Sequence, residues 1–149
     1  MKKYELTEET VTVYGKTLYR IRAVRDFGSV KTGEFGGYIE KEENLSHFGN
    51  AWIYGDAWVY GNARVSGNAK VFNTRHFFVQ GPIGSRDGYV TFYRTKDDTV
   101  EVRCGCFSGS LQKFVDRVEE THGGSRYEKE YKLAAELAKV CIRLEGESR

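Results

Sequence analysis

The chain has 149 residues, of which 40% are hydrophobic and 14% aromatic, with 23 Lys and Arg against 21 Asp and Glu. This composition excludes a disordered chain, and no apolar run approaches the ~20 residues that a membrane-spanning helix needs. A net charge of +2 is too small to drive general binding to nucleic acid. Acidic residues at positions 5, 8 and 9 argue against an export signal, so we expect a cytoplasmic protein with free cysteine thiols and no membrane partner.

The N-terminal segment, 1–34, is predicted to form a β-hairpin. Hydrophobic and polar residues alternate over residues 10–24, with a Tyr-Gly-Lys turn near the centre of that stretch. The alternation places Arg20 and Arg22 on the same side of one strand. A solvated strand face is the simplest interpretation of these two arginines.

The middle of the chain, 35–80, contains a six-residue repeat. Four consecutive hexads span 49–72, and each begins with Gly-Asn-Ala or Gly-Asp-Ala and has Ile or Val in its fifth position. The aliphatic residue and the Ala are predicted to point inward, and the glycine supplies the backbone freedom that each corner requires. This pattern favours a parallel β-helix in which each hexad forms one face.

The hexads resemble the hexapeptide-repeat family of left-handed β-helices, in which three hexads form one coil of ~18 residues. The resemblance implies that inward residues stack in columns, one of which contains Phe35, Ile53, Val71 and Tyr89. The expected fold class is therefore mainly β with α: a short left-handed parallel β-helix, flanked by the N-terminal hairpin and by a C-terminal hairpin with two helices.

Residues beside the inward aliphatic positions point outward, and several of them are aromatic. The predicted apolar interface consists of Trp52, Tyr54, Trp58, Tyr60, Phe72 and Phe78. Such a surface does not simply face water, so we expect the chain's own flanking segments or sister subunits to cover it. Because members of the hexapeptide family are often trimers, the resemblance implies a homotrimer.

The C-terminal segment, 81–149, is predicted to contain a loop, a second hairpin over 89–104 and two helices. Apolar residues with helical spacing indicate the first helix, which ends at a His-Gly-Gly sequence: Leu111, Phe114, Val115 and Val118. A capping-box pattern at 125–128 begins the second helix, which is expected to run to about residue 144. Its alanine-rich side suits close packing against either the first helix or the aromatic face of the β-helix, and we expect the latter.

The glycine-rich loop at 81–88 is the strongest candidate for a ligand site. Its backbone N–H groups and neighbouring guanidinium groups suit an anion, and nearby tyrosines suit a stacked base. The predicted ligand-binding residues are Gly84, Ser85, Arg86, Tyr89, Tyr93, Arg94 and Arg103. The alternative interpretation is a plain connection between the repeats and the hairpin, because the loop lacks the ending of a phosphate-binding P-loop.

Metal binding and catalysis have weaker support in the sequence. Cys104 and Cys106 with His122 provide only three ligands at an unusual spacing, so no metal and no cofactor are expected. The hexapeptide resemblance also extends to acyltransferases, for which His47 or His76 is the candidate base. The repeat array is short and no long loop is present to hold a nucleotide-linked acyl donor, so we do not expect an enzyme.

Nearly the whole chain resembles small bacteriophage and prophage hexapeptide-repeat proteins. The resemblance rests on residues 18–23, 36–39, 81–87 and 104–107 together with the hexads. It implies a phage accessory protein without known catalytic residues. We therefore expect a non-catalytic anti-defence protein that sequesters an anionic, nucleotide-type small molecule. The alternatives are an interaction protein that inhibits a host protein through its aromatic face and, third, an acyltransferase-like enzyme.

Overall fold

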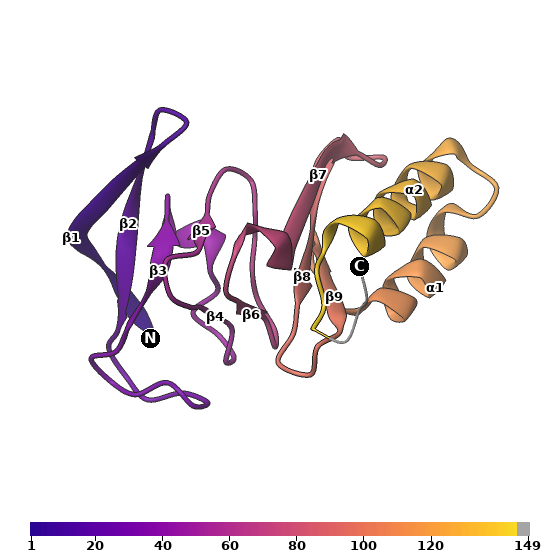
Figure 1. Cartoon of the computed structure of the whole chain (residues 1–149). Coiled ribbons are helices and arrows are strands. Elements are labelled where there is room, and N and C mark those ends of the chain that lie inside the picture. The colour runs from indigo at the N-terminus through magenta and orange to yellow at the C-terminus, as the bar shows by residue number, and fades with distance from the viewer. Residues whose placement is uncertain (146–149) are drawn as a thin grey trace.

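A computed structural model describes residues 1–145 of the chain. Figure 1 shows four layers that follow one another from the N-terminus to the C-terminus. A mixed four-stranded sheet comes first, the hexads second, an antiparallel four-stranded sheet third and a pair of helices last. Within the described residues, neither helix is long and apolar enough to cross a membrane.

The N-terminal layer confirms the predicted hairpin and extends it. Its strands are β1 (Tyr4–Val13), β2 (Lys16–Ala23), β3 (Phe35–Ile39) and β5 (Trp58–Val59), in the order β1-β2-β3-β5. The turn falls at Tyr14 and Gly15, whose φ angles of 51° and 77° suit a tight two-residue hairpin turn. The last pair, β3 with β5, is parallel and attaches the hairpin layer to the second hexad.

The hexads place their side chains as the repeat predicts. All four alanines and all four Ile or Val residues are at most 5% exposed, and the four leading glycines have φ between 58° and 71°. A residue with a side chain is strained at such φ values, so the glycines permit the corners. The strands in this layer are the two-residue β4 (Trp52–Ile53) and β6 (Lys70–Val71), which pair in parallel.

The predicted left-handed parallel β-helix is nevertheless wrong as the fold class. Most strand pairing lies in the mixed and the antiparallel four-stranded sheets, and parallel pairs are short wherever the structure describes them. The predicted column also fails at its ends, because Phe35 is 58% and Tyr89 41% exposed. Ile39 and Leu45 instead lie opposite Val59 and Val65, 20 residues along the chain, whereas Ile53 lies opposite Val71, 18 residues along, so the register shifts between Leu45 and Ile53.

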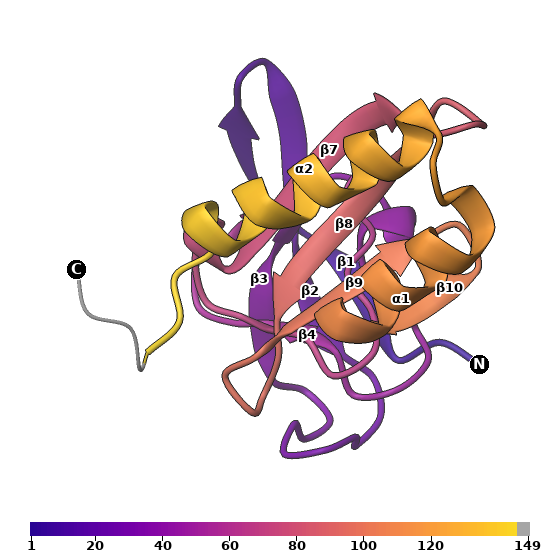
Figure 2. The same cartoon turned by 90° about the vertical axis from the view of Figure 1, so that its right-hand side faces the viewer.

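The antiparallel sheet confirms the second hairpin and adds a strand on each side of it. Its strands are β7 (Phe77–Ile83), β8 (Gly88–Arg94), β9 (Val100–Cys104) and β10 (Phe107–Ser110), in the order β10-β9-β8-β7. A 3₁₀ turn at Thr74–His76 leads from the last hexad into β7. Helices α1 (Leu111–His122) and α2 (Arg126–Cys141) lie across one face of this sheet, as Figure 2 shows.

The favoured packing of the second helix against the aromatic face is wrong, and the alternative, packing against the first helix, is confirmed. The buried alanines of α2 share a hydrophobic cluster with α1 and the sheet, rather than with the aromatic residues of the hexads. The capping box is also absent: the Ser125 hydroxyl donates to the His122 carbonyl at 2.6 Å and makes no cap bond. The Glu128 carboxylate instead accepts from the Gly124 N–H at 2.9 Å.

Strand β8 joins the N-terminal half of the molecule, made of the mixed sheet and the hexads, to the C-terminal half, made of the antiparallel sheet and the helices. It does so because its side chains alternate between two cores. Val90 and Phe92 are buried beneath the helices. Tyr93 is buried in the hexad cluster, where its hydroxyl lies 3.3 Å from the Ser66 hydroxyl. Thr91, on that same face, accepts a hydrogen bond from the Arg64 N–H at 2.9 Å. The antiparallel sheet therefore closes the end of the hexad layer.

Lys3 is a buried cation beneath the N-terminal sheet. It is 0% exposed, and its ammonium donates to the Ala51 carbonyl at 2.7 Å. Burial, together with the neighbouring Arg25, lowers the pKa of Lys3 to about 7. The unfolded chain keeps a lysine pKa near ~10.4 and so binds more protons than the native state at pH values between these two pKa values.

We predict that stability rises as the pH increases from 7 to 9, because Lys3 must take up a proton on unfolding and this uptake becomes less favourable as the pH rises. The gain attributable to Lys3 is on the order of 1–2 kcal/mol over this range. Urea denaturation at both pH values measures it. Lys3→Met should flatten the dependence, and Lys2→Met, at an exposed neighbouring site, should not. If the free energy of unfolding changed equally with pH in both variants, Lys3 would not be the cause of the pH dependence.

Candidate functional site

A cavity of about 910 Å³ opens where the hexads meet the end of the antiparallel sheet and the helix pair. Its size lies within the ~300–1,000 Å³ typical of small-molecule sites. The turn before β8, the turn after β9 and the third hexad contribute most of its polar wall, and the start of β10, α1 and α2 contribute an apolar wall. The polar wall includes Asn62, Arg64, Ser85, Arg86, Tyr89, Arg103 and Cys106, and the apolar wall includes Phe107, Phe114, Val118 and Tyr131.

The lining of this cavity is strongly basic. Five cations border it, Lys41, Arg64, Arg86, Arg103 and Arg117, against one carboxylate, Glu43. Among residues 1–145, none of these five cations forms an ion pair with a carboxylate. Guanidinium groups without a carboxylate partner around a concave site favour an anionic ligand.

The structure brings four of the seven predicted ligand residues together. Ser85, Arg86, Tyr89 and Arg103 all border the cavity. Gly84 lies behind this wall, where its N–H donates to the Glu130 carboxylate at 2.7 Å and is therefore not free for a ligand. The loop thus contributes side chains to the cavity, and the predicted backbone anion nest lacks the N–H of Gly84.

Tyr93 and Arg94 lie away from the cavity and have structural partners. Tyr93 is fully buried in the hexad core. Arg94 is also buried and forms ion pairs with Asp98 at 3.1 Å and Glu145 at 3.0 Å. The prediction grouped both with Tyr89 because they are close in sequence, but the β8 strand carries them to its other end.

Most residues that border the cavity were missing from the predicted ligand set, among them Arg64, Arg117 and His122. Arg64 occupies the outward position of the third hexad, where the first two hexads carry Trp52 and Trp58. That change from Trp to Arg at a repeated outward position is a sequence feature that could have identified Arg64. Arg117 lies on α1 with its guanidinium 5.6 Å from the Phe107 ring centre, and His122 ends that helix. No sequence pattern distinguishes Arg117 from other helix-surface arginines.

Two cysteines and a histidine also border the cavity. Cys104 has a hydrogen bond with the Tyr131 hydroxyl, and burial raises the pKa of its thiol. Cys106 is exposed on the turn, and the His122 ring lies 5.5 Å from the Tyr131 ring. Within the part of the chain that the structure describes, no three His, Cys, Asp or Glu side chains gather as a metal site.

The two histidines considered as catalytic bases lie elsewhere. His47 stacks on Tyr4 with ring centres 4.0 Å apart and contacts Glu42 at 2.8 Å. His76 is buried and accepts the Phe72 N–H at 2.9 Å, and burial lowers its pKa. Neither borders the cavity, so His122 is the histidine available to a ligand bound there.

The predicted aromatic interface is divided between different parts of the chain. Trp52 is 1% exposed beneath Tyr4 and Phe27, and Trp58 and Tyr60 pack against the N-terminal hairpin. Phe78 belongs to the helix-covered core. Tyr54 stacks on Phe72 at 4.6 Å, and Phe72 stays 42% exposed. The chain itself therefore covers most of this aromatic surface.

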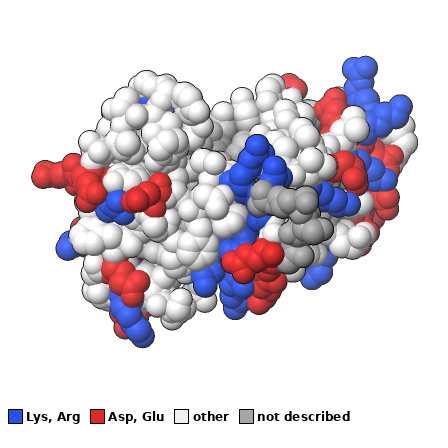
Figure 3. All heavy atoms as spheres, in the orientation of Figure 1, with Lys and Arg blue, Asp and Glu red and all other residues white. Residues whose placement is uncertain are grey.

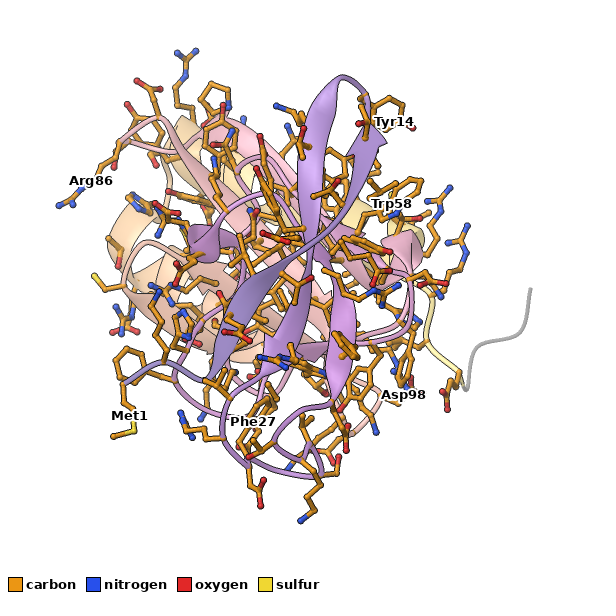
Figure 4. The ribbon with its side chains drawn as sticks, turned by 90° about the vertical axis from the view of Figure 1, so that its left-hand side faces the viewer. Met1, Tyr14, Phe27, Trp58, Arg86 and Asp98 are labelled. Atoms are coloured by element: carbon orange, nitrogen blue, oxygen red, sulfur yellow. The ribbon has the colours of Figure 1, made fainter. Side chains whose placement is uncertain are left out.

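The cavity and the aromatic surface lie on different sides of the molecule. Figure 4 shows Arg86 at one edge and Trp58 at the opposite edge. On the face drawn in Figure 3, uncharged atoms cover most of the N-terminal half, and charged side chains gather toward the C-terminal half. A ligand in the basic cavity therefore does not compete with a partner on the aromatic side.

No protein family model matches the sequence. Part of the chain is similar to the uncharacterized acetyltransferase YdcK of Escherichia coli (strain K12), with 39% identity. The match covers 36% of this chain and only 19% of that protein. The relative's name points toward enzymatic activity, against the expectation of a non-catalytic protein, and the phage context stays a prediction.

We predict that Gly84→Ala destabilises the protein by about 2 kcal/mol, because Gly84 has a φ of 82° and a Cβ there would overlap the Tyr131 hydroxyl. Urea denaturation measures the effect. Gly88→Ala in the same loop is the matched control, because its Cβ would have no neighbour within 4 Å. If both variants were equally stable, Tyr131 would not be held against this loop as described.

Proposed function

We propose that this protein binds and sequesters an anionic, nucleotide-type small molecule in the basic cavity. The observation that supports the proposal is the set of five cations without carboxylate partners around one 910 Å³ cavity. Phosphate groups match guanidinium donors in charge and in hydrogen-bond geometry. Tyr89 and the aromatic residues of the apolar wall are suited to a planar base. Homotrimer formation and a role against host defence remain predictions from the sequence.

Native mass spectrometry of protein purified from bacteria is the first test, followed by titration with a panel of nucleotides. We predict that the double variant Arg86→Gln, Arg103→Gln lowers nucleotide affinity roughly 100-fold, since each charged hydrogen bond contributes about 1.5–3 kcal/mol. Arg126→Gln is the matched control, because this exposed arginine on α2 does not border the cavity. Absence of binding by every nucleotide would contradict the proposal.

A second candidate function is acyl transfer, which the local similarity to an acetyltransferase favours. In this case the cavity would hold a nucleotide-linked acyl donor, and His122 would accept the proton of the acceptor's hydroxyl or amine. The acceptor's oxygen or nitrogen would then attack the acyl carbon, the carbon–sulfur bond of the donor thioester would break, and the leaving thiolate would take the proton from His122.

The two candidates differ in their response to His122→Gln. If the protein only binds its ligand, this variant keeps nucleotide affinity within about threefold, and neither form releases thiol from an acetyl thioester. If the protein transfers acyl groups, the wild type releases thiol and His122→Gln slows the release by roughly 100-fold or more. A thiol-release assay with acetyl-coenzyme A and simple amines measures this difference. Thiol release by the wild type would overturn the non-catalytic proposal.

A further inference from the structure

We propose that the cavity binds a nucleotide with at least two phosphates in one fixed orientation, with its base on Tyr89 and its phosphates between Arg64 and Arg103. This inference rests on the nucleotide binding proposed above and adds the charge and the direction of the ligand. It follows from the positions of these three residues on the antiparallel sheet and the third hexad.

Tyr89 has the geometry of a stacking platform. Its ring lies directly against the backbone of Gly81, where an added Cβ would be 2.5 Å from Cδ2 of the ring. The side chain is nevertheless 41% exposed and borders the cavity. One part of the ring is therefore supported by backbone while the rest is open. A base has an aromatic face of its own, and stacking on such a ring contributes about 1–3 kcal/mol.

The sheet and the third hexad bring the backbones of two arginines close to this platform. Thr91 is two residues along β8 from Tyr89, so both side chains are on the same face and about 7 Å apart. Arg103 lies directly opposite Thr91 in the β8–β9 ladder, which places it on that face too. The backbone N–H of Arg64 donates to the Thr91 hydroxyl at 2.9 Å, which anchors the third hexad beside Arg103.

Arg64 and Arg103 thus approach the same position from the two halves of the molecule. The Arg103 Nε–H donates to the Gly105 carbonyl at 2.8 Å, which holds its guanidinium group at the turn that borders the cavity, and the exposed Arg64 borders the same cavity. The phosphates would therefore lie between these two guanidinium groups in the cavity, at the end where the hexads and the antiparallel sheet separate, while the base rests on Tyr89.

The charge of the cavity sets a lower limit on the charge of the ligand. Five cations face one carboxylate, so a singly charged ligand would leave most of the positive charge uncompensated. Like charges in a concave, partly dehydrated site repel one another more strongly than they do in water. A diphosphate or triphosphate compensates this charge, and a monophosphate does so only in part.

Isothermal titration calorimetry with adenosine and guanosine, their mono-, di- and triphosphates, and inorganic triphosphate tests the inference. We expect affinity to rise roughly tenfold with each added phosphate. Arg64→Gln should weaken binding of nucleoside triphosphate and of inorganic triphosphate by a similar factor of about ten. Tyr89→Leu should weaken the nucleoside triphosphate roughly tenfold and leave inorganic triphosphate unchanged.

Matched controls separate these effects from general damage. Lys70→Gln changes a cation in the equivalent outward position of the next hexad, which does not border the cavity, and Tyr14→Leu removes an exposed tyrosine at the hairpin turn. Both should bind like the wild type. Thermal denaturation confirms that all four variants fold, as expected for side chains that are at least partly exposed.

The outcomes distinguish this inference from the function on which it rests. If nucleosides and monophosphates bound as tightly as triphosphates, or if Tyr89→Leu weakened inorganic triphosphate as much as the nucleotide, the orientation would be wrong while nucleotide binding stood. If no nucleotide bound at all, both the function and the inference would be wrong. If Arg64→Gln weakens both triphosphates and Tyr89→Leu weakens only the nucleoside triphosphate, the results support both nucleotide binding and the proposed orientation.

Discussion

The rest of the structure depends on one constraint: successive side chains of β8 point to opposite faces of the antiparallel sheet, and both faces are buried. One side of this strand buries Val90 and Phe92 under the helices, and the other side carries Thr91 and Tyr93 to the hexads. Neither half closes its core alone, because the hexads leave an open end and the sheet has two apolar faces. Burying both faces of one strand fuses the halves and fixes their relative position.

The cavity is a consequence of this junction. The hexads meet the sheet along β8 and β9, but beyond Gly88 and Cys104 the sheet ends and the layers separate. The turns at that end are rich in glycine and short polar residues, and they leave room that no side chain fills. Arg64 reaches this space from the hexads and Arg103 from the sheet. Two structural units that share no sequence pattern therefore supply one site.

The sequence predicted local structure well and its assembly poorly. The inward positions of the hexads, the two hairpins and both helices follow from periodicities of two, six and 3.6 residues, which depend only on neighbours along the chain. The β-helix prediction was wrong because the residues before Gly49 pair in another register and because most strands belong to other sheets. Arg86 was predicted from the glycine-rich loop and Arg103 from the hairpin that follows it, whereas Arg64 and Arg117 join the site only through long-range packing.

Two-dimensional NMR of the arginine Nε–Hε groups during titration with a nucleoside triphosphate tests the central claim most directly. The claim is that guanidinium groups without a carboxylate partner, from both halves of the molecule, form one anion site. The account predicts that the signals of Arg64, Arg86 and Arg103 shift together and saturate at the same ligand concentration, while those of Arg20 and Arg94, which have carboxylate partners, stay in place. Shifts confined to one half of the molecule, or centred near the Tyr54 and Phe72 stack, would contradict it.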